Sequence, residues 1–147
     1  MRVIFVCTGN TCRSPMAEAI FKDKFKEHTF ISRGLFVPEK CGASFNSVEA
    51  MREMGLDITN HISCQLSEND VNDCDLILTM TKSQRDKIRA VCPEHSGKIY
   101  TLCEYSGVDG EIDDPYGGSE SVYRSCAYKI LQTAEEIDFD KRSDMRR

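Results

Sequence analysis

A short apolar run near the start of the chain, residues 3–6 (Val-Ile-Phe-Val), leads directly into a polar segment at residues 7–14. That segment reads Cys-Thr-Gly-Asn-Thr-Cys-Arg-Ser, and Pro15 follows it. Consecutive apolar residues are typical of a strand buried on both faces, as in a parallel sheet. Serine followed by proline is typical of a helix start, with Ser14 as N-cap and Pro15 as the first helical residue. These residues predict a strand, a tight polar loop and a helix.

Short apolar runs alternate with amphipathic segments along the rest of the chain, which is typical of an α/β fold. Strands are expected over 2–6, 29–33, 75–80 and 98–102. Helices are expected over about 14–27, from Ser44 to Gly55, from Thr81 to Pro93, and over about 120–138. We predict a single doubly wound domain over 1–147, with a four-stranded parallel sheet and helices on both faces. In such a fold the functional site lies at the carboxyl ends of the strands, here after the first strand.

Composition excludes several classes of function. The net charge of −5 argues against binding to nucleic acid or to an anionic membrane. No apolar stretch is long enough for a signal peptide or a membrane span, so we expect a cytoplasmic protein whose eight cysteines are reduced. There is no Cys-x-x-Cys pair and the three histidines are scattered, so we expect no metal site and no cofactor. The sequence leaves the oligomeric state open.

The polar segment has the parts of an anion site. A loop that leads into a helix offers backbone N–H groups, and the helix dipole adds to their attraction for a phosphate. Gly9 lets the backbone approach the phosphate closely, and Asn10 tolerates the left-handed region of backbone conformation. The Arg13 guanidinium can bind two phosphate oxygens at once. The same environment favours a Cys7 thiolate, which Ser14 could stabilise with a hydrogen bond. We therefore expect an enzyme that attacks a phosphoryl group with Cys7.

A second loop, Asp113-Asp114-Pro115-Tyr116-Gly117-Gly118, precedes the last predicted helix. Proline and paired glycines fix a loop whose tip can lean over another site. A carboxylic acid there could protonate the leaving group and then accept a proton from the hydrolytic water. Asp114, directly before the proline, is the better candidate of the two aspartates.

Together these segments resemble the low-molecular-weight cysteine phosphatase family, over nearly the whole chain. The resemblance covers residues 6–18, Asn60-His61 and Asp114-Pro115. It implies a phospho-cysteine intermediate on Cys7, transition-state stabilisation by Arg13, acid and base roles for Asp114, and no metal. It also implies a phosphorylated protein as the substrate and a role for His61 in bracing Asn10.

Two threonines separate this chain from the tyrosine phosphatases of the family, which usually carry bulky aliphatic residues at the positions of Thr8 and Thr11. The loop strings look most like those of the bacterial protein arginine phosphatases. A polar wall at Thr11 suits a guanidinium, and Tyr116 could stack on its plane. Substrate contacts are thus expected from the loop and from Tyr116: Thr8, Gly9, Asn10, Thr11, Cys12, Ser14 and Tyr116. We expect phosphoarginine as substrate, with phosphotyrosine as the alternative.

Two rival classes share parts of this pattern. Thioredoxin-coupled arsenate reductases use the same Cys-x5-Arg loop but need further thiols as a relay. Thr81 occupies about the place where that relay begins, and Cys74 and Cys92 are wrongly spaced. A non-catalytic phosphate binder would need neither Cys7 nor Asp114.

Two residues near the loop are left with open roles. Cys12 is five positions from Cys7, and we hypothesise a reversible disulfide that protects the nucleophile from over-oxidation. The alternative is a packed thiol. Arg33, in Ser32-Arg33-Gly34 where the family often has Ser-Ala-Gly, either adds charge near the site or points to solvent.

Overall fold

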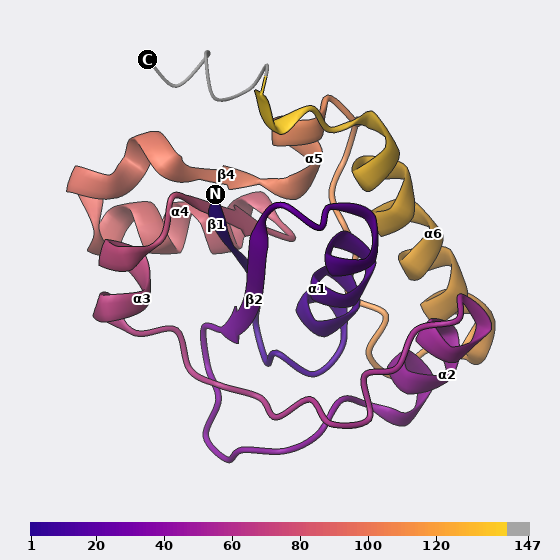
Figure 1. Ribbon diagram of the computed structural model, residues 1–147. Helices are drawn as coiled ribbons and strands as arrows, with labels where there is room; N and C mark the ends of the chain where they lie inside the picture. Colours follow the sequence, from indigo (N-terminus) through magenta and orange to yellow (C-terminus); the bar gives the residue numbers. More distant parts are fainter. Residues whose placement is uncertain (141–147) are drawn as a thin grey trace.

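The computed structural model describes residues 1–140, and its sheet confirms the predicted architecture (Figure 1). The four strands are β1 (Arg2–Cys7), β2 (Thr29–Gly34), β3 (Leu76–Thr79) and β4 (Ile99–Thr101). All pairings are parallel, in the order β2-β1-β3-β4. The last residues of the predicted domain, 141–147, lie outside the described part of the chain.

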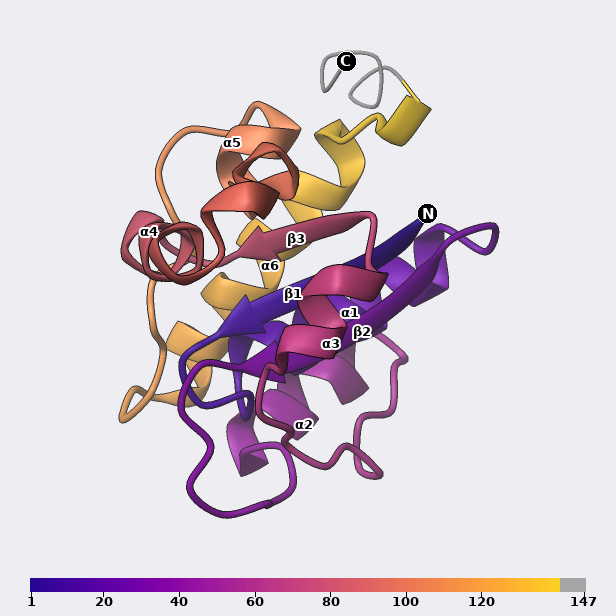
Figure 2. The same ribbon diagram turned by 90° about the vertical axis from the view of Figure 1, so that its left-hand side faces the viewer.

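Helices cover both faces of this sheet (Figures 1 and 2). They are α1 (Arg13–Lys24), α2 (Phe45–Glu53), α3 (Glu68–Asp73), α4 (Lys82–Val91), α5 (Leu102–Ser106) and α6 (Glu120–Glu136), with a 3-10 helix, η1 (Pro93–Lys98). α1, α2 and α6 pack together on one face, α3 and α4 lie on the other, and α5 follows β4 at the edge. No helix within residues 1–140 is both long and apolar enough to cross a bilayer.

The position of β1 in the sheet explains why residues 3–6 are apolar without interruption. Val3 and Phe5 belong to the larger core under α1 and α6, whereas Ile4 and Val6 belong to the smaller core under α3 and α4. Successive side chains of a strand point to opposite faces, so a central strand covered on both sides must be apolar throughout. β1 is therefore anchored on both faces, and its last residue, Cys7, lies at the carboxyl edge of the sheet.

The helix boundaries follow their capping residues. The Ser44 side chain caps α2, and Gly55 follows that helix with a φ of 77°, as predicted from its position. Thr81 and Gln84 form the predicted capping box at the start of α4. The short helices α3, α5 and η1 were not predicted.

The predicted start of the first helix is wrong in its details. α1 begins at Arg13, with Cys12 as an N-cap residue that makes no side-chain cap hydrogen bond. Ser14 therefore lies inside the first turn, and its hydroxyl bonds to Cys7 and Asn10 instead of capping the helix. α1 also ends at Lys24, short of the expected residue 27. Because no side chain caps α1, the first amides of the helix stay available to the loop.

Candidate active site

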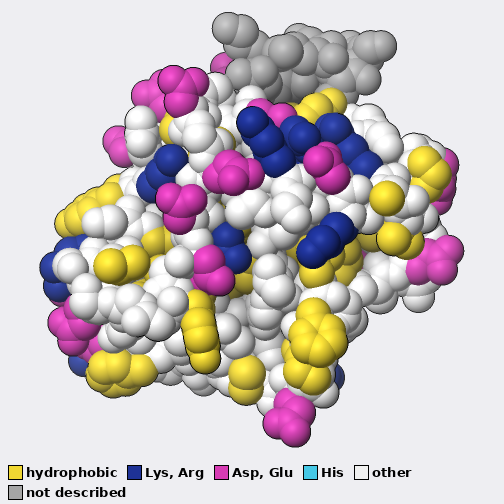
Figure 3. All heavy atoms as spheres, turned by 180° about the vertical axis from the view of Figure 1, so that it is seen from behind, with side chains coloured by type: hydrophobic (Ala, Val, Ile, Leu, Met, Phe, Trp, Pro, Cys, Tyr) yellow, Lys and Arg dark blue, Asp and Glu magenta, His cyan; other side chains and the backbone are white. Residues whose placement is uncertain are grey.

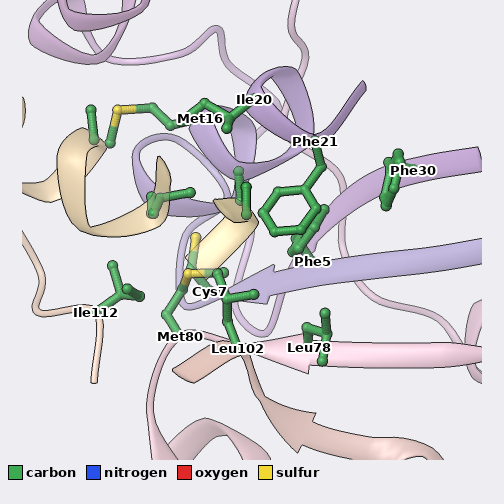
Figure 4. Close-up of a cluster of buried hydrophobic side chains, with 14 of the residues drawn as sticks. Phe5, Cys7, Met16, Ile20, Phe21, Phe30, Leu78, Met80, Leu102 and Ile112 are labelled. Atoms are coloured by element: carbon green, nitrogen blue, oxygen red, sulfur yellow. The ribbon is translucent and has the colours of Figure 1, made fainter. Parts of the chain in front are cut away.

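Cys7 lies at the floor of the loop that joins β1 to α1, where its side chain is only 3% exposed. Figure 4 shows it at the tip of β1, beside Met80 and Leu102. Its Sγ accepts a hydrogen bond from the Asn10 backbone N–H, with an N–Sγ distance of 3.3 Å, and lies 3.0 Å from Ser14 Oγ. The thiol is thus buried at the edge of the core but faces polar donors of its own loop.

The loop backbone turns its carbonyl groups outward and leaves most of its N–H groups unused. Four carbonyls accept hydrogen bonds from the surrounding protein: Cys7 from Leu35 N, Thr8 from Phe36 N, Asn10 from His61 Nε2 and Thr11 from Ser44 N. In the described part of the chain, four loop amides donate to no protein acceptor, those of Thr8, Gly9, Thr11 and Cys12. Unused amides beside a helix N-terminus form an anion-binding nest, so this arrangement can hold a phosphate above Cys7.

Asn10 holds the loop in shape from inside. Its side chain is fully buried, and its φ of 59° lies in the left-handed region that asparagine tolerates. Oδ1 accepts from Cys64 N at 2.9 Å, while Nδ2 donates to Ser14 Oγ at 2.7 Å and to Ser32 Oγ at 3.0 Å. Asn10 was predicted to contact substrate, but its side chain is fully used in bracing the loop.

Ser14 links this brace to the thiol. Its Oγ accepts a hydrogen bond from Asn10 Nδ2, so its own proton is free to donate. The nearer acceptor is Cys7 Sγ at 3.0 Å, compared with 3.5 Å for the carbonyl oxygen of Arg33. The Ser14 hydroxyl is therefore placed to donate a hydrogen bond to Cys7 Sγ.

The predicted contact between His61 and Asn10 is present. His61 Nε2 lies 2.7 Å from the Asn10 backbone oxygen, and since a carbonyl can only accept, Nε2 carries the proton. Gly34, at the end of β2, allows this close packing. A Cβ atom there would lie 3.0 Å from both Asn10 Cβ and the carbonyl oxygen of Thr8.

Arg13 and Asp114 come together although they are far apart in sequence. The Arg13 guanidinium is buried, its Nη1 donates to the Ile112 carbonyl at 2.9 Å, and its Nη2 lies 3.8 Å from Asp114 Oδ2. The Asp114 side chain is 56% exposed, and its Oδ1 accepts from the backbone N–H of Tyr116. A fixed cation and an exposed carboxyl group therefore meet at the rim of the loop.

The two threonines lie at the opening of the loop. Thr8 is exposed and Thr11 is half-buried. Gly9 and Thr11 line a shallow hollow of about 390 Å³, whose other lining residues are Phe36, Val37, Pro38, Glu39 and Cys41. Tyr116 is 81% exposed, and no ring contact within residues 1–140 ties it to the loop.

The match to known proteins extends over almost the whole chain. The profile of the low molecular weight phosphotyrosine protein phosphatase family matches residues 2–141. This chain belongs to that family. It is a phosphoprotein phosphatase, as the resemblance of its loops implied. The family therefore accounts for the doubly wound fold and for a thiol and an arginine at the two ends of one loop.

Relatives in this phosphatase family carry both tyrosine and arginine phosphatase names. The low molecular weight protein-tyrosine-phosphatase PtpB of Staphylococcus epidermidis is 41% identical over 139 residues, which cover 95% of this chain and 98% of that protein. A protein-arginine-phosphatase of Bacillus subtilis is 35% identical over 151 residues, covering 99% and 100% of the two chains. The solved low molecular weight protein tyrosine phosphatase of T. tengcongensis has a TM-score of 0.88 and 41% identity, over 92% and 96%.

Cys12 of this phosphatase points away from the mouth of the loop. Its Sγ lies 3.4 Å from Ser44 Oγ and 3.6 Å from the Tyr123 hydroxyl, between α2 and α6. Burial raises the pKa of Tyr123 to about 12, and the hydrogen bond to Cys12 adds to the rise, so the hydroxyl keeps its proton at neutral pH. The side chain of Cys12 thus packs under the loop instead of facing a substrate, and only its backbone N–H is free for an anion.

Arg33 has a defined role. Its Nε lies 3.0 Å from Asp70 Oδ2, and Nη1 donates to the Ser32 carbonyl. The guanidinium ties β2 to α3 and adds no charge to the phosphate loop. On the face seen in Figure 3, basic and acidic side chains are interspersed, so phosphate affinity is not supplied there by a broad basic surface.

The arsenate reductase relay lacks its thiols in this phosphatase. Thr81, at the expected relay position, is the N-cap of α4. Cys74 precedes β3 and therefore lies at the amino edge of the sheet, opposite Cys7, and burial raises the pKa of its thiol. Cys92 ends α4. The geometry gives these thiols no route to Cys7.

Sequence reasoning missed four partners of the site: the Ser32 hydroxyl, the Cys64 amide, the Gln84 side chain and the Ile112 carbonyl. Ser32 stands in the Ser-x-Gly string that was noted, so its position gave a signal. Backbone groups carry no signal in the sequence, because every residue has them.

Proposed function

We propose that this phosphatase hydrolyses phosphoarginine in proteins, with Cys7 as the nucleophile. The observation that carries the choice of substrate is the pair of hydroxyl-bearing loop residues that reach the surface, Thr8, which is exposed, and Thr11, which lines the hollow beside the loop. A guanidinium leaving group has several N–H donors that hydroxyl oxygens can accept, whereas a phenol ring gains more from an apolar wall.

In the first step the phosphate enters the nest of loop amides, and Arg13 binds its non-bridging oxygens. Cys7 Sγ attacks phosphorus, so the S–P bond forms while the P–N bond breaks. Asp114, protonated and at the rim of the loop, gives its proton to the departing nitrogen. The guanidinium of Arg13 is already oriented by the Ile112 carbonyl, so little reorganisation accompanies the charge that develops on the oxygens.

In the second step a water molecule attacks the phospho-cysteine. The Asp114 carboxylate accepts a proton from that water, the O–P bond forms and the S–P bond breaks. The electron pair returns to sulfur, and the Ser14 hydroxyl, 3.0 Å away, stabilises the thiolate that leaves. Inorganic phosphate is released, and the enzyme returns with Asp114 protonated. All groups that these steps require belong to the chain, so we propose no cofactor.

A second candidate substrate is phosphotyrosine, which one observation favours. The exposed ring of Phe36 lines the same hollow as Gly9 and Thr11, and could pack against a phenol ring. The identity of 41% to a relative named as a tyrosine phosphatase supports this alternative as well.

The deciding experiment measures kcat/KM on matched phosphoarginine and phosphotyrosine peptides. We expect the purified protein to prefer phosphoarginine, Cys7→Ser to abolish turnover on both, and Thr11→Ile to shift the preference toward the aryl substrate by about tenfold, the scale of one lost polar contact. Equal preference in the protein and in Thr11→Ile would refute the selectivity argument. Turnover by Cys7→Ser at the original rate would refute the nucleophile.

The role of Asp114 is tested with its neighbour as control. Asp114→Asn should lower kcat on phosphoarginine by about 10²–10⁴, because general acid catalysis contributes that much. Asp113→Asn keeps the loop sequence almost unchanged and should retain the rate. Equal losses in the two variants would mean that the loop needs negative charge but no specific acid.

The reaction also bears on the setting of the enzyme. A thiolate nucleophile survives in a reducing compartment, so we propose that the protein acts in the cytoplasm on phosphorylated proteins.

A further inference from the structure

A buried glutamine lies behind the opening of the phosphate loop. Gln84, in the first turn of α4, is only 4% exposed. Its Oε1 accepts two backbone hydrogen bonds, from Met80 N at 2.9 Å and Thr81 N at 3.1 Å. Since only the carbonyl oxygen of an amide can accept, these two bonds fix which way the side-chain amide points.

The other end of this amide reaches the loop after β1. Gln84 Nε2 donates to Thr8 Oγ1, with an N–O distance of 3.1 Å. Figure 2 shows how the fold allows it: β1 and β3 end at the same edge of the sheet, and α4 starts there. Within residues 1–140 this is the one hydrogen bond of the Thr8 hydroxyl, so a lone pair and the hydroxyl proton of Thr8 remain for a molecule at the exposed opening.

We propose that Gln84 is a positioning residue that sets the leaving-group preference of this phosphatase through Thr8. The inference rests on the proposed function, and concerns how its polar wall is held. Gln84 does not touch the substrate. It orients the Thr8 oxygen so that a free lone pair can accept a hydrogen bond from an N–H of a guanidinium leaving group. A phenol ring has no such N–H donor.

Burial makes the pair act as one unit. A side chain without an acceptor at position 8 would leave Gln84 Nε2 buried with an unmet donor, which is costly. Loss of Gln84 would free the Thr8 hydroxyl to rotate, so its lone pair would no longer be oriented before the substrate binds. The two residues should therefore be energetically coupled.

The experiment compares Gln84→Met, Gln84→Glu, Thr8→Val and the double variant Thr8→Val/Gln84→Met. The readout is the ratio of kcat/KM for a phosphoarginine peptide to that for a matched phosphotyrosine peptide. Inhibition by inorganic phosphate, which has no leaving group, is measured alongside, because a general loosening of the loop would weaken it. The control is Glu104→Met, which removes the equivalent capping-box side chain from α5.

We expect Gln84→Met and Thr8→Val each to lower the ratio about three- to tenfold, the effect of one hydrogen bond. The double variant should lower the ratio no further than Thr8→Val alone. Inhibition by inorganic phosphate should be unchanged in these variants, and Glu104→Met should keep the original ratio. Gln84→Glu keeps the capping box, but its carboxylate would accept the hydroxyl proton of Thr8. Both lone pairs of Thr8 Oγ1 are then free for the substrate, and a negative charge lies near the guanidinium of the leaving group. This variant should raise the ratio.

The proposal is overturned if Gln84→Met slows both substrates equally, or if the effects of the two single variants add in the double variant. Should Gln84→Met fail to fold, Gln84→Glu decides, and a ratio equal to or below the original refutes the proposal. These outcomes concern shifts of a ratio, so they stand apart from the proposed function, which fails if Cys7→Ser remains active or if the unmodified protein prefers phosphotyrosine.

Discussion

Replacement of Asn10 by alanine should destabilise the protein strongly, because one buried side chain supports the whole phosphate loop. The change removes three hydrogen bonds, to the Cys64 amide and to the hydroxyls of Ser14 and Ser32. Each buried hydrogen bond contributes about 0.5–1.5 kcal/mol, so their loss costs about 1.5–4.5 kcal/mol. Alanine at a φ of 59° adds about 1 kcal/mol of backbone strain. We expect Asn10→Ala to lower the free energy of unfolding by about 2.5–5.5 kcal/mol.

Urea unfolding, followed by far-UV circular dichroism, measures this difference directly. Asn10→Gly separates the two contributions, because glycine loses the same hydrogen bonds but adopts a positive φ without strain. It should be more stable than Asn10→Ala by about 1 kcal/mol. Asn60→Ala serves as the control, since Asn60 is exposed in a neighbouring loop, and should stay within about 0.5 kcal/mol of the original.

A loss below about 1 kcal/mol in Asn10→Ala would refute the reasoning, because the loop would then hold its shape without its central side chain. If Asn10→Ala is more stable than Asn10→Gly, the argument from backbone strain is wrong. Activity gives a second measure: Asn10 N donates to Cys7 Sγ, and a distorted loop would misplace this donor, so kcat should fall together with stability.

Three further predictions concern packing and thiol chemistry. Gly34→Ala should destabilise the protein by about 1–3 kcal/mol in urea unfolding, as overpacking does, since a Cβ atom there would lie 2.6 Å from Val37 Cγ2. The hypothesised disulfide predicts that mild peroxide treatment links Cys7 to Cys12 reversibly, which requires Cys12 Sγ to leave Ser44 and Tyr123; peptide mapping that finds Cys7 only as unlinked sulfinic acid would favour the packed thiol instead. Burial raises the pKa of Cys126 to about 12, so this thiol stays protonated at pH 8 and should resist iodoacetamide in the folded protein but not in urea; rapid labelling before unfolding would contradict its burial.

The sequence was sufficient to predict the sheet because its signals are local. The runs at β1 and β3 are apolar at consecutive positions, and this pattern has few other interpretations at that length. α3 and α5 were missed because they span only residues 68–73 and 102–106, too short for an apolar period to develop. The start of α1 was misplaced because Ser14 and Pro15 look like a cap, although Ser14 is needed by the thiol.

In the candidate site, too, residues with local sequence signals were predicted and residues without them were not. Cys7, Arg13 and the loop glycine and asparagine could be predicted because the chemistry lies within eight consecutive residues. Asp114 was found only because its loop has a recognisable proline and glycine pattern. The Ile112 carbonyl and the Gln84 side chain could not be predicted, since their places depend on how separate strands meet at one edge of the sheet.

The loop carbonyls are held by several different segments of the chain, and this affects how the sequence of the enzyme can change. Cys7 stands at the end of β1, but the hydrogen-bond partners of its loop come from the segments around residues 35, 44, 61 and 112. Insertions or exchanges in those segments would reshape what reaches the sulfur while the strand beneath it stays the same. A fold of this kind can therefore change its protein targets while the strand and the loop at its end stay the same.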